Sequence, residues 1–421
     1  MPDLTWVATD LRTGLLLADL PDLDVSNVKA TIGRYESTTA TLPIPSAPEN
    51  WQRATLEGAA CLNLLSDGNP IWGGNVTKRI RDESDKITIS LVTVESYLDR
   101  RYVGDVSYGA TVANPSIPSV GQNNIVASLV NAYIADGAKP GLPIRVQFTT
   151  AGVGALRDRT YLDASDKTVY SALTELMGVI GGPEWTVGWE WQHNPERITP
   201  VLYVGDRIGA AVPSGMGPAA TFEMPGSVIS VSMLEDYSAG KGANDVMAVS
   251  SASGSVRPQS PRQLSAGTSR PTFEYRWTPS TSITDVGTLS AHAQQALGIL
   301  SNGSATVNLS AVVSDAPVLG VDWSIGDDIG FAIGGLEDDP AMKAVTTKTG
   351  FDLFTDVFHD IFGTPGKSSI ALARANTLGR ESVPAFPGGF AGVARCIGWE
   401  LEISETPIIT PTLLSATIAG S

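Results

Sequence analysis

Lys86-Ile87-Thr88-Ile89-Ser90-Leu91-Val92-Thr93-Val94 carries the clearest structural signal in this 421-residue chain. Apolar residues occupy odd positions as far as Leu91, and most of the even positions are polar. This alternation predicts a β-strand with one buried face. The preceding residues 66–70, Ser-Asp-Gly-Asn-Pro, predict a turn. Further strands are expected at 4–9, 13–18, 25–33, 60–66 and 71–80, so residues 1–105 are predicted to form a β-barrel-like domain.

Residues 106–225 mix helical and strand patterns. Apolar residues recur at helical spacing from Asn123 to Asp136, and Gly137 is expected to end that helix. A second helix is expected after an N-cap at Ser165 or Asp166, ending before the Gly-Gly-Pro at 181–183. Two strands follow, at 185–191 and 198–204. This region is predicted to be a mixed α+β domain.

Strand patterns return from about residue 226. The predicted strands are 227–235, 244–250, 272–277, 304–313, 328–333, 369–374 and 394–404. A helix over 283–300 interrupts them, 251–271 is expected to be an exposed loop, and 335–393 is a long insertion. Residues 226–410 are predicted as a second β-barrel-like domain, followed by a C-terminal tail, 411–421. The fold class is therefore mainly β with α+β inserts, in which two barrel-like domains flank a mixed domain.

Composition narrows the function. The net charge is −16. Binding to DNA would therefore gain no free energy from counterion release, and specific nucleic-acid binding is not expected. Cys61 and Cys396 are the two cysteines, and they are expected to be buried thiols rather than a disulfide framework. The N-terminus lacks the pattern of a signal peptide, and no apolar run is long enough to span a membrane.

Catalytic signatures are missing from the sequence. It contains no GxSxG, HExxH, GxxxxGK[ST] or strand-linked GxGxxG pattern. His193, His292 and His359 do not pair at metal-ligand spacing. Carboxylate pairs remain, at Asp327-Asp328 and within Glu337-Asp338-Asp339, and solvated turn residues are the favoured interpretation of both. We therefore predict no enzyme activity, no metal and no cofactor.

Trp185, Trp189 and Trp191 lie at alternate positions of one predicted strand, so their rings are expected to share a face. Packing in a core is the favoured interpretation. The alternative is a surface aromatic patch that binds a sugar or a partner.

Residues 351–363, Phe-Asp-Leu-Phe-Thr-Asp-Val-Phe-His-Asp-Ile-Phe-Gly, form a second aromatic segment. Five of its apolar residues share a helical face: Phe351, Phe354, Phe358, Ile361 and Phe362. One interpretation is a helix docked on its own barrel. The other is an apolar element for trimer closure, plugging of a tube or contact with a tape-measure protein.

Several segments together resemble one protein family. Residues 9–14 (Thr-Asp-Leu-Arg-Thr-Gly), 70–79 (Pro-Ile-Trp-Gly-Gly-Asn-Val-Thr-Lys-Arg) and 96–103 (Ser-Tyr-Leu-Asp-Arg-Arg-Tyr-Val) resemble minor tail proteins of actinobacteriophages. Residues 325–329 (Ile-Gly-Asp-Asp-Ile) and 395–401 (Arg-Cys-Ile-Gly-Trp-Glu-Leu) resemble the C-terminal barrel of that family. The family is the tail-tip hub, or tail-associated protein, of long-tailed phages (siphophages), which shares the baseplate hub fold.

The resemblance implies a homotrimer in the virion tail tip that continues the tail tube and has a role in genome ejection. Its implied partners are the distal tail protein, the tape-measure protein, receptor-binding or central fibre proteins and, at the tip, the host cell surface. Assembly is expected in the host cytoplasm, with DNA passing through the lumen unbound. Two alternatives from other classes are a carbohydrate-binding adhesin of the tail tip and a cell-wall hydrolase with two carboxylates.

Overall fold

A computed structural model gives the fold of the chain. It describes residues 2–109, 120–135, 137, 139–150, 154–179, 181–213, 216–251, 257–265, 269–278, 283–334 and 389–419, with side chains as far as Leu414. The chain divides into two compact units. The larger unit comprises 1–230, 309–412 and 417–421, and the smaller unit comprises 231–308 and 413–416.

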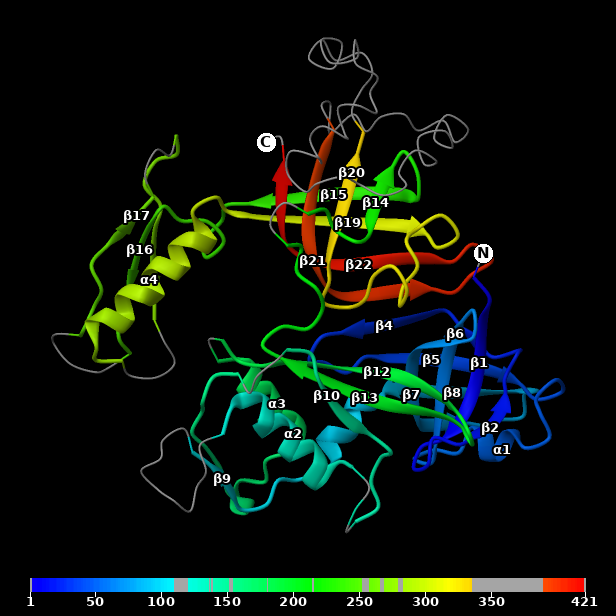
Figure 1. The fold of residues 1–421 in the computed structure, drawn as a ribbon. Helices are drawn as coiled ribbons and strands as arrows, with labels where there is room; N and C mark the ends of the chain where they lie inside the picture. Colours follow the sequence, from blue (N-terminus) through cyan, green and yellow to red (C-terminus); the bar gives the residue numbers. More distant parts are fainter. Residues whose placement is uncertain are drawn as a thin grey trace. The chain divides into compact units, whose positions relative to one another are not determined.

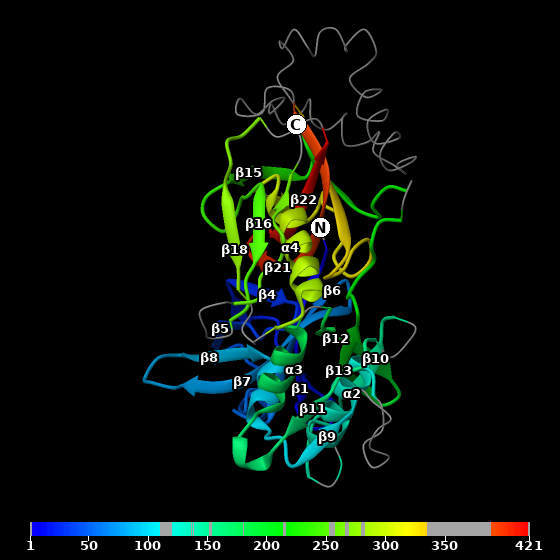
Figure 2. The same cartoon turned by 90° about the vertical axis from the view of Figure 1, so that its left-hand side faces the viewer.

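The N-terminal region forms a seven-stranded sheet in which all neighbouring strands are antiparallel (Figure 1). Its strands, in spatial order, are β2 (Leu16–Asp19), β1 (Leu4–Asp10), β6 (Ala60–Ser66), β7 (Asn69–Ile80), β8 (Lys86–Thr93), β5 (Ser37–Pro43) and β3 (Asp24–Val25). The predicted alternation in β8 is confirmed, because Ile87, Ile89 and Leu91 are buried. Figure 2 shows the β7–β8 hairpin extending beyond the rest of this sheet. The short helix α1 (Trp51–Ala54) and the 3-10 helix η1 (Val94–Arg100) complete this region.

The mixed region packs two helices, α2 (Gln122–Tyr133) and α3 (Val169–Met177), with a three-stranded sheet. The strands run in the order β10 (Arg145–Phe148), β13 (Glu196–Gly205) and β12 (Glu184–His193), with β10 parallel to β13. Apolar side chains from both helices and the sheet share one core, including Ile125, Leu129, Leu173, Trp185 and Leu202. Three short elements complete the region: β9 (Val106–Tyr108), β11 (Arg159–Tyr161) and η2 (Asp163–Ser165).

The predicted N-cap of α3 is wrong. Ser165 ends the 3-10 helix η2, and Asp166 adopts a left-handed conformation after it. Thr168 caps the helix instead, since its side-chain oxygen accepts the Ser171 N–H at 3.1 Å. Threonine supplies the same kind of hydroxyl acceptor as serine, but only Thr168 lies at the N-cap position of the helix that forms.

A second seven-stranded sheet forms around the long strand β21 (Phe390–Glu402). Its strands run in the order β14 (Thr221–Met224), β20 (Asp328–Ile333), β21, β22 (Ile408–Ala419), β19 (Ser304–Val312) and β15 (Val228–Asp236). The seventh strand is β4 (Asn27–Thr31), which pairs with β21 in the register Glu400↔Lys29. The N-terminal region thus contributes a strand to the C-terminal sheet. Residues from 411 to 419 belong to β22, so the tail expected there is mostly strand.

The smaller unit carries a three-stranded sheet covered by one helix (Figure 1). Its strands are β17 (Gln263–Leu264), β16 (Asp245–Ala248) and β18 (Glu274–Trp277), and its helix is α4 (Val286–Leu300). Leu289, Ala293 and Leu300 of α4 pack with Val246 and Ala248 of β16. The helix predicted over 283–300 therefore exists, and the segment predicted as an exposed loop contains β17.

The predicted fold class, mainly β with α+β inserts, is confirmed, because two large sheets flank the mixed region along the chain. The predicted boundaries at 105, 225 and 410 remain a proposal, and the compact units divide the chain elsewhere. The predicted strand 369–374 lies outside the described residues.

Candidate functional site

The candidate site residues predicted from the sequence do not lie together in the structure. The aromatic segment with Phe351, Phe354, Phe358, Ile361 and Phe362 lies outside the described residues, as do His359 and the acids at 337–339. Its contact with a trimer partner or a tape-measure protein therefore stays a prediction. Of the described histidines, His193 is exposed at the end of β12, and His292 stacks on Trp277 with ring centroids 4.6 Å apart.

The three tryptophans of β12 lie at or near the interior. Trp185 is fully buried and meets Tyr170 edge to face, with ring centroids 6.0 Å apart, so it cannot belong to a surface patch. Trp189 and Trp191 are half-buried and pack against a cluster of Val7, Leu65 and Ile198. A side chain at Gly73 would overlap the Trp189 ring, so glycine is needed there for β7 and β12 to approach closely. Trp185 therefore packs in the core. A surface aromatic patch could involve only Trp189 and Trp191, which are half-buried.

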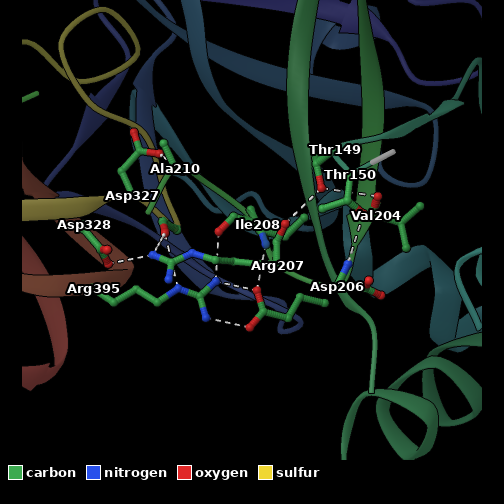
Figure 3. Close-up of polar contacts among 12 residues, drawn as sticks. Thr149, Thr150, Val204, Asp206, Arg207, Ile208, Ala210, Asp327, Asp328 and Arg395 are labelled. Atoms are coloured by element: carbon green, nitrogen blue, oxygen red, sulfur yellow. Dashed lines mark hydrogen bonds and ion pairs between the residues drawn. The ribbon is translucent and has the colours of Figure 1, made fainter. Parts of the chain in front are cut away.

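A cluster of charged side chains joins the mixed region to the second large sheet within the larger unit (Figure 3). We call it the junction network, and it consists of Glu184, Arg207, Asp327, Asp328 and Arg395. Glu184 begins β12, and Arg207 follows the end of β13. Asp328 begins β20 and lies directly opposite Arg395 of β21 in the strand register.

Two ion pairs form the centre of the junction network. Arg395 binds Glu184 through both ends of its guanidinium, with Nη1 2.6 Å from Oε1 and Nη2 contacting Oε2. Arg207 Nη2 lies 2.6 Å from Asp328 Oδ1. Both arginines also donate to the Gly326 carbonyl, at 3.2 Å from Arg395 Nε and 3.3 Å from Arg207 Nη2. Bidentate charge-assisted bonds of this kind fix orientation as well as adding energy.

The ion pair between Glu184 and Arg395 shifts the pKa values of both side chains. Burial would raise the pKa of Glu184, but the hydrogen bonds from Arg395 and from the Ile208 N–H outweigh it and hold the pKa below its usual range. The hydrogen bond to the Glu184 carboxylate raises the pKa of Arg395. Both groups therefore stay charged at neutral pH, as an ion pair requires.

Asp327 and Asp328 accept hydrogen bonds from backbone N–H groups. Asp327 accepts the Ala210 N–H at 2.6 Å and the Ser324 N–H at 2.7 Å. Asp328 accepts the Val212 N–H at 3.0 Å with the oxygen that does not face Arg207. These carboxylates were a sequence candidate for two-acid hydrolysis. In the structure both carboxylates bind backbone N–H groups of the loop that follows β13, at Ala210 and Val212.

Two glycines allow this close approach. Gly209 and Gly326 both have left-handed backbones, with φ of +77° and +94°. A side chain at Gly209 would overlap the backbone of Gly326 and Asp327, and one at Gly326 would overlap the Ile208 carbonyl. The two loops therefore pack backbone against backbone, which only glycine permits.

Sequence reasoning did not identify the junction network. Asp327 and Asp328 were noted as an acidic pair, and Arg395 only as part of a resemblance. Glu184 and Arg207 gave no signal, since their partners lie more than 100 residues away along the chain. The Gly-Asp-Asp turn at 326–328 was the one local pattern that pointed to this place.

The described residues contain neither a metal-binding cluster nor a helix that could span a membrane. Among the described residues, no group of three or more His, Cys, Asp or Glu side chains is placed to hold a metal ion. No helix in the same part of the chain has the length and apolar character needed to cross a membrane.

Comparisons with known proteins give likenesses of structure. No family model and no curated protein sequence matches this chain. A tail protein from Neisseria meningitidis MC58 is similar with a TM-score of 0.50 and 10% identity, over 97% of this chain and 96% of that chain. The 43 kDa tail protein of prophage MuSo2 from Shewanella oneidensis is similar with a TM-score of 0.52 and 8% identity, over 98% of both chains. Because both likenesses run almost end to end, this chain has the fold of phage tail proteins, as the resemblance in its sequence implied.

Proposed function

We propose that this chain is a structural protein of a phage tail tip, where three copies form the hub that continues the tail tube. The observation that carries the proposal is the likeness of fold to two tail proteins over nearly the whole of each chain. Because a shared fold does not by itself fix a function, the proposal needs support from the chain's own residues.

The junction network supplies part of that support. Its carboxylates and guanidiniums bind one another or backbone groups, so they hold two sheets together rather than remaining free for chemistry. A wall of a tube requires rigid sheets and contact surfaces. We therefore propose a non-enzymatic role for the chain.

The proposed partners are further copies of this chain, the distal tail protein, the tape-measure protein and receptor-binding or central fibre proteins. The protein would assemble in the host cytoplasm, reside in the virion tail tip, where the host cell surface is a further contact, and take part in genome ejection. A ring of three copies would carry three times −16, or −48 charges. Carboxylates along its lumen would repel DNA phosphates, so the genome would slide through without binding.

Labelling of particles tests the proposed location. Antibodies raised against the purified chain, coupled to gold, are applied to phage particles from a strain that encodes it. We expect gold at the end of the tail farthest from the head. Gold spread along the tail tube, or protein found only in the particle-free lysate, would contradict a place in the tail tip. Separately, a trimer whose channel wall is net basic would refute the repulsive lumen.

A further inference from the structure

The segment 26–36 contacts both large sheets of the larger unit, and we call it the central strap. Its strand β4 pairs with β21 of the second sheet through the backbone (Figure 1). Side chains of the first sheet bond to its other edge. Trp72 Nε1 of β7 donates to the Lys29 carbonyl at 2.8 Å, and the Thr38 hydroxyl of β5 donates to the Asn27 carbonyl at 2.7 Å. The central strap is therefore bonded to both sheets.

The turn after β4 connects the central strap to the mixed region as well. The Gly33 N–H donates to the Trp185 carbonyl of β12 at 2.9 Å. The Tyr35 ring packs against the Tyr170 ring of α3, with centroids 4.9 Å apart. Gly33 has a left-handed backbone, with φ +68°, and a side chain there would overlap Met177. Because one segment contacts three parts of the fold, loosening it would change the contacts of each part.

Glu36 ends the central strap and joins it to a buried carboxyl group. The Glu36 carboxylate accepts the hydroxyl of Thr31, the last residue of β4, at 2.7 Å. The Glu36 backbone exchanges two hydrogen bonds with Thr93, at 2.9 and 3.0 Å. The Thr93 hydroxyl also hydrogen-bonds to the carboxyl group of Glu95, which is only 7% exposed. A chain of contacts therefore runs from β4 through Glu36 and Thr93 to Glu95.

The surroundings of Glu95 disfavour its charged form. Burial raises the pKa of Glu95 to about 7, and the nearby Glu36 adds to the shift. The Cys61 thiol of β6 also lies near this carboxyl group, and the Val187 N–H of β12 donates to it. Glu95 is therefore neutral in acid and gains a charge beside Glu36 in mild alkali. Two like charges repel strongly where water is largely excluded.

We propose that the central strap is a pH-sensitive latch, which is closed while Glu95 is protonated and loosens when Glu95 ionises beside Glu36. Repulsion would move the Glu36 carboxylate, and the hydrogen bond from Thr31 at the end of β4 would break. The closed state binds the Glu95 proton more tightly than the loosened state does. The latch is therefore closed in acid and loosens as the pH rises through 7. This inference does not depend on the proposed place in a tail tip.

Hydrogen–deuterium exchange of the full chain, measured by mass spectrometry of its peptides, tests the latch. Glu95→Gln keeps the shape of the protonated side chain and cannot ionise. At about pH 8.5 we expect the amides of 26–36 to exchange about tenfold more slowly in Glu95→Gln than in wild type, and at about pH 5.5 equally fast. Peptides covering β20, 328–333, are expected to exchange alike in both proteins. Glu196→Gln, which removes an exposed carboxylate, is the control and is expected to behave like wild type.

Thr31→Val tests the contact between β4 and Glu36 separately. It removes the hydroxyl that Glu36 accepts and keeps the branched shape of the side chain. In this background Glu95→Gln is expected to slow the exchange of 26–36 at about pH 8.5 by less than about twofold, because the link to β4 is already lost. Thr39→Val is the matched control, since Thr39 is exposed on β5 and its hydroxyl makes no hydrogen bond with a described residue.

Three results would overturn the latch. The first is equal exchange of 26–36 in wild type and Glu95→Gln at about pH 8.5. The second is an equal change in every peptide of the larger unit, which would mean that Glu95 acts on the stability of the whole fold and not on the central strap. The third is an effect of Glu95→Gln as large in the Thr31→Val background as in wild type.

Discussion

Glu184 and Arg395 lie 211 positions apart in the sequence and form a bidentate ion pair between β12 and β21. Their side chains are only 20% and 19% exposed, so water screens the pair weakly. The pair joins the three-stranded sheet to the second large sheet within the larger unit. Removing one member of such a pair leaves a largely buried charge without its partner, which costs more free energy than breaking a surface pair.

Arg395→Ala tests the importance of this pair. It leaves Glu184 charged and half-enclosed without its partner, and we expect the free energy of unfolding to fall by about 2–4 kcal/mol. Arg145→Ala is the matched control, because Arg145 pairs with Glu190 on the surface, where the side chains are 46% and 37% exposed. That loss is expected to stay below about 1 kcal/mol. Urea unfolding measures both, and equal losses would contradict a special role for the junction network.

Gly326→Ala tests the backbone contact with Ile208. The new side chain would overlap the Ile208 carbonyl while the residue keeps a left-handed backbone, and we expect a loss of about 3 kcal/mol. Gly68→Ala is the control, since Gly68 is also left-handed, with φ +79°, but faces open space. Its loss is expected to be about 1–2 kcal/mol. If thermal unfolding shows no difference between the two variants, the loops do not pack as described.

The buried carboxyl group of Glu95 is expected to make the stability of the fold depend on pH. Burial, assisted by the nearby Glu36, raises its pKa from an ordinary 4.5 to about 7, although hydrogen bonds from Thr93 and Val187 oppose the shift. The folded state holds this proton more tightly than the unfolded state. The resulting stabilisation is complete below pH 4.5 and is lost as the pH rises through 7.

Urea unfolding at about pH 5 and pH 8.5 measures this effect, which is worth roughly 3 kcal/mol between the two conditions. Glu95→Gln cannot ionise and is expected to remove most of the difference. The exposed Glu196→Gln serves as the control and is expected to behave like wild type. A pH dependence that is identical in all three proteins would show that Glu95 is not the titrating group.

The two cysteines are expected to be inert in the folded chain. Burial raises the pKa of both thiols, that of Cys396 to about 12, and both side chains are almost fully covered. A thiol reagent at pH 8 should therefore label neither cysteine in the native protein and both after denaturation in guanidinium. Rapid labelling of the native protein would mean that one of these strands opens easily.

Local patterns predicted much of the fold because many strands bury one face against their own neighbours. The alternation at 86–94 located β8, and the runs at 60–66 and 328–333 located β6 and β20. Such patterns record which face is buried and nothing about the partner. The pairing of β4 with β21, some 370 residues apart, therefore had no local signal.

The junction network was hidden for the same physical reason. An ion pair forms only where two side chains meet in space. Nothing in the sequence around Glu184 or Arg207 distinguishes them from ordinary surface residues. The strand β22 was missed because Pro411 suggests a break, yet Ile409, Pro411 and Leu413 alternate as buried positions along it. Proline is tolerated in a strand where its missing N–H is not required by the ladder.

The mass of the purified chain in solution tests the central proposal most directly. Light scattering after size exclusion, at several protein concentrations and moderate salt, distinguishes one copy from three. We predict a stable species of three times 44.1 kDa, about 132 kDa, that persists on dilution. A single 44.1 kDa species at every concentration would contradict a trimeric hub.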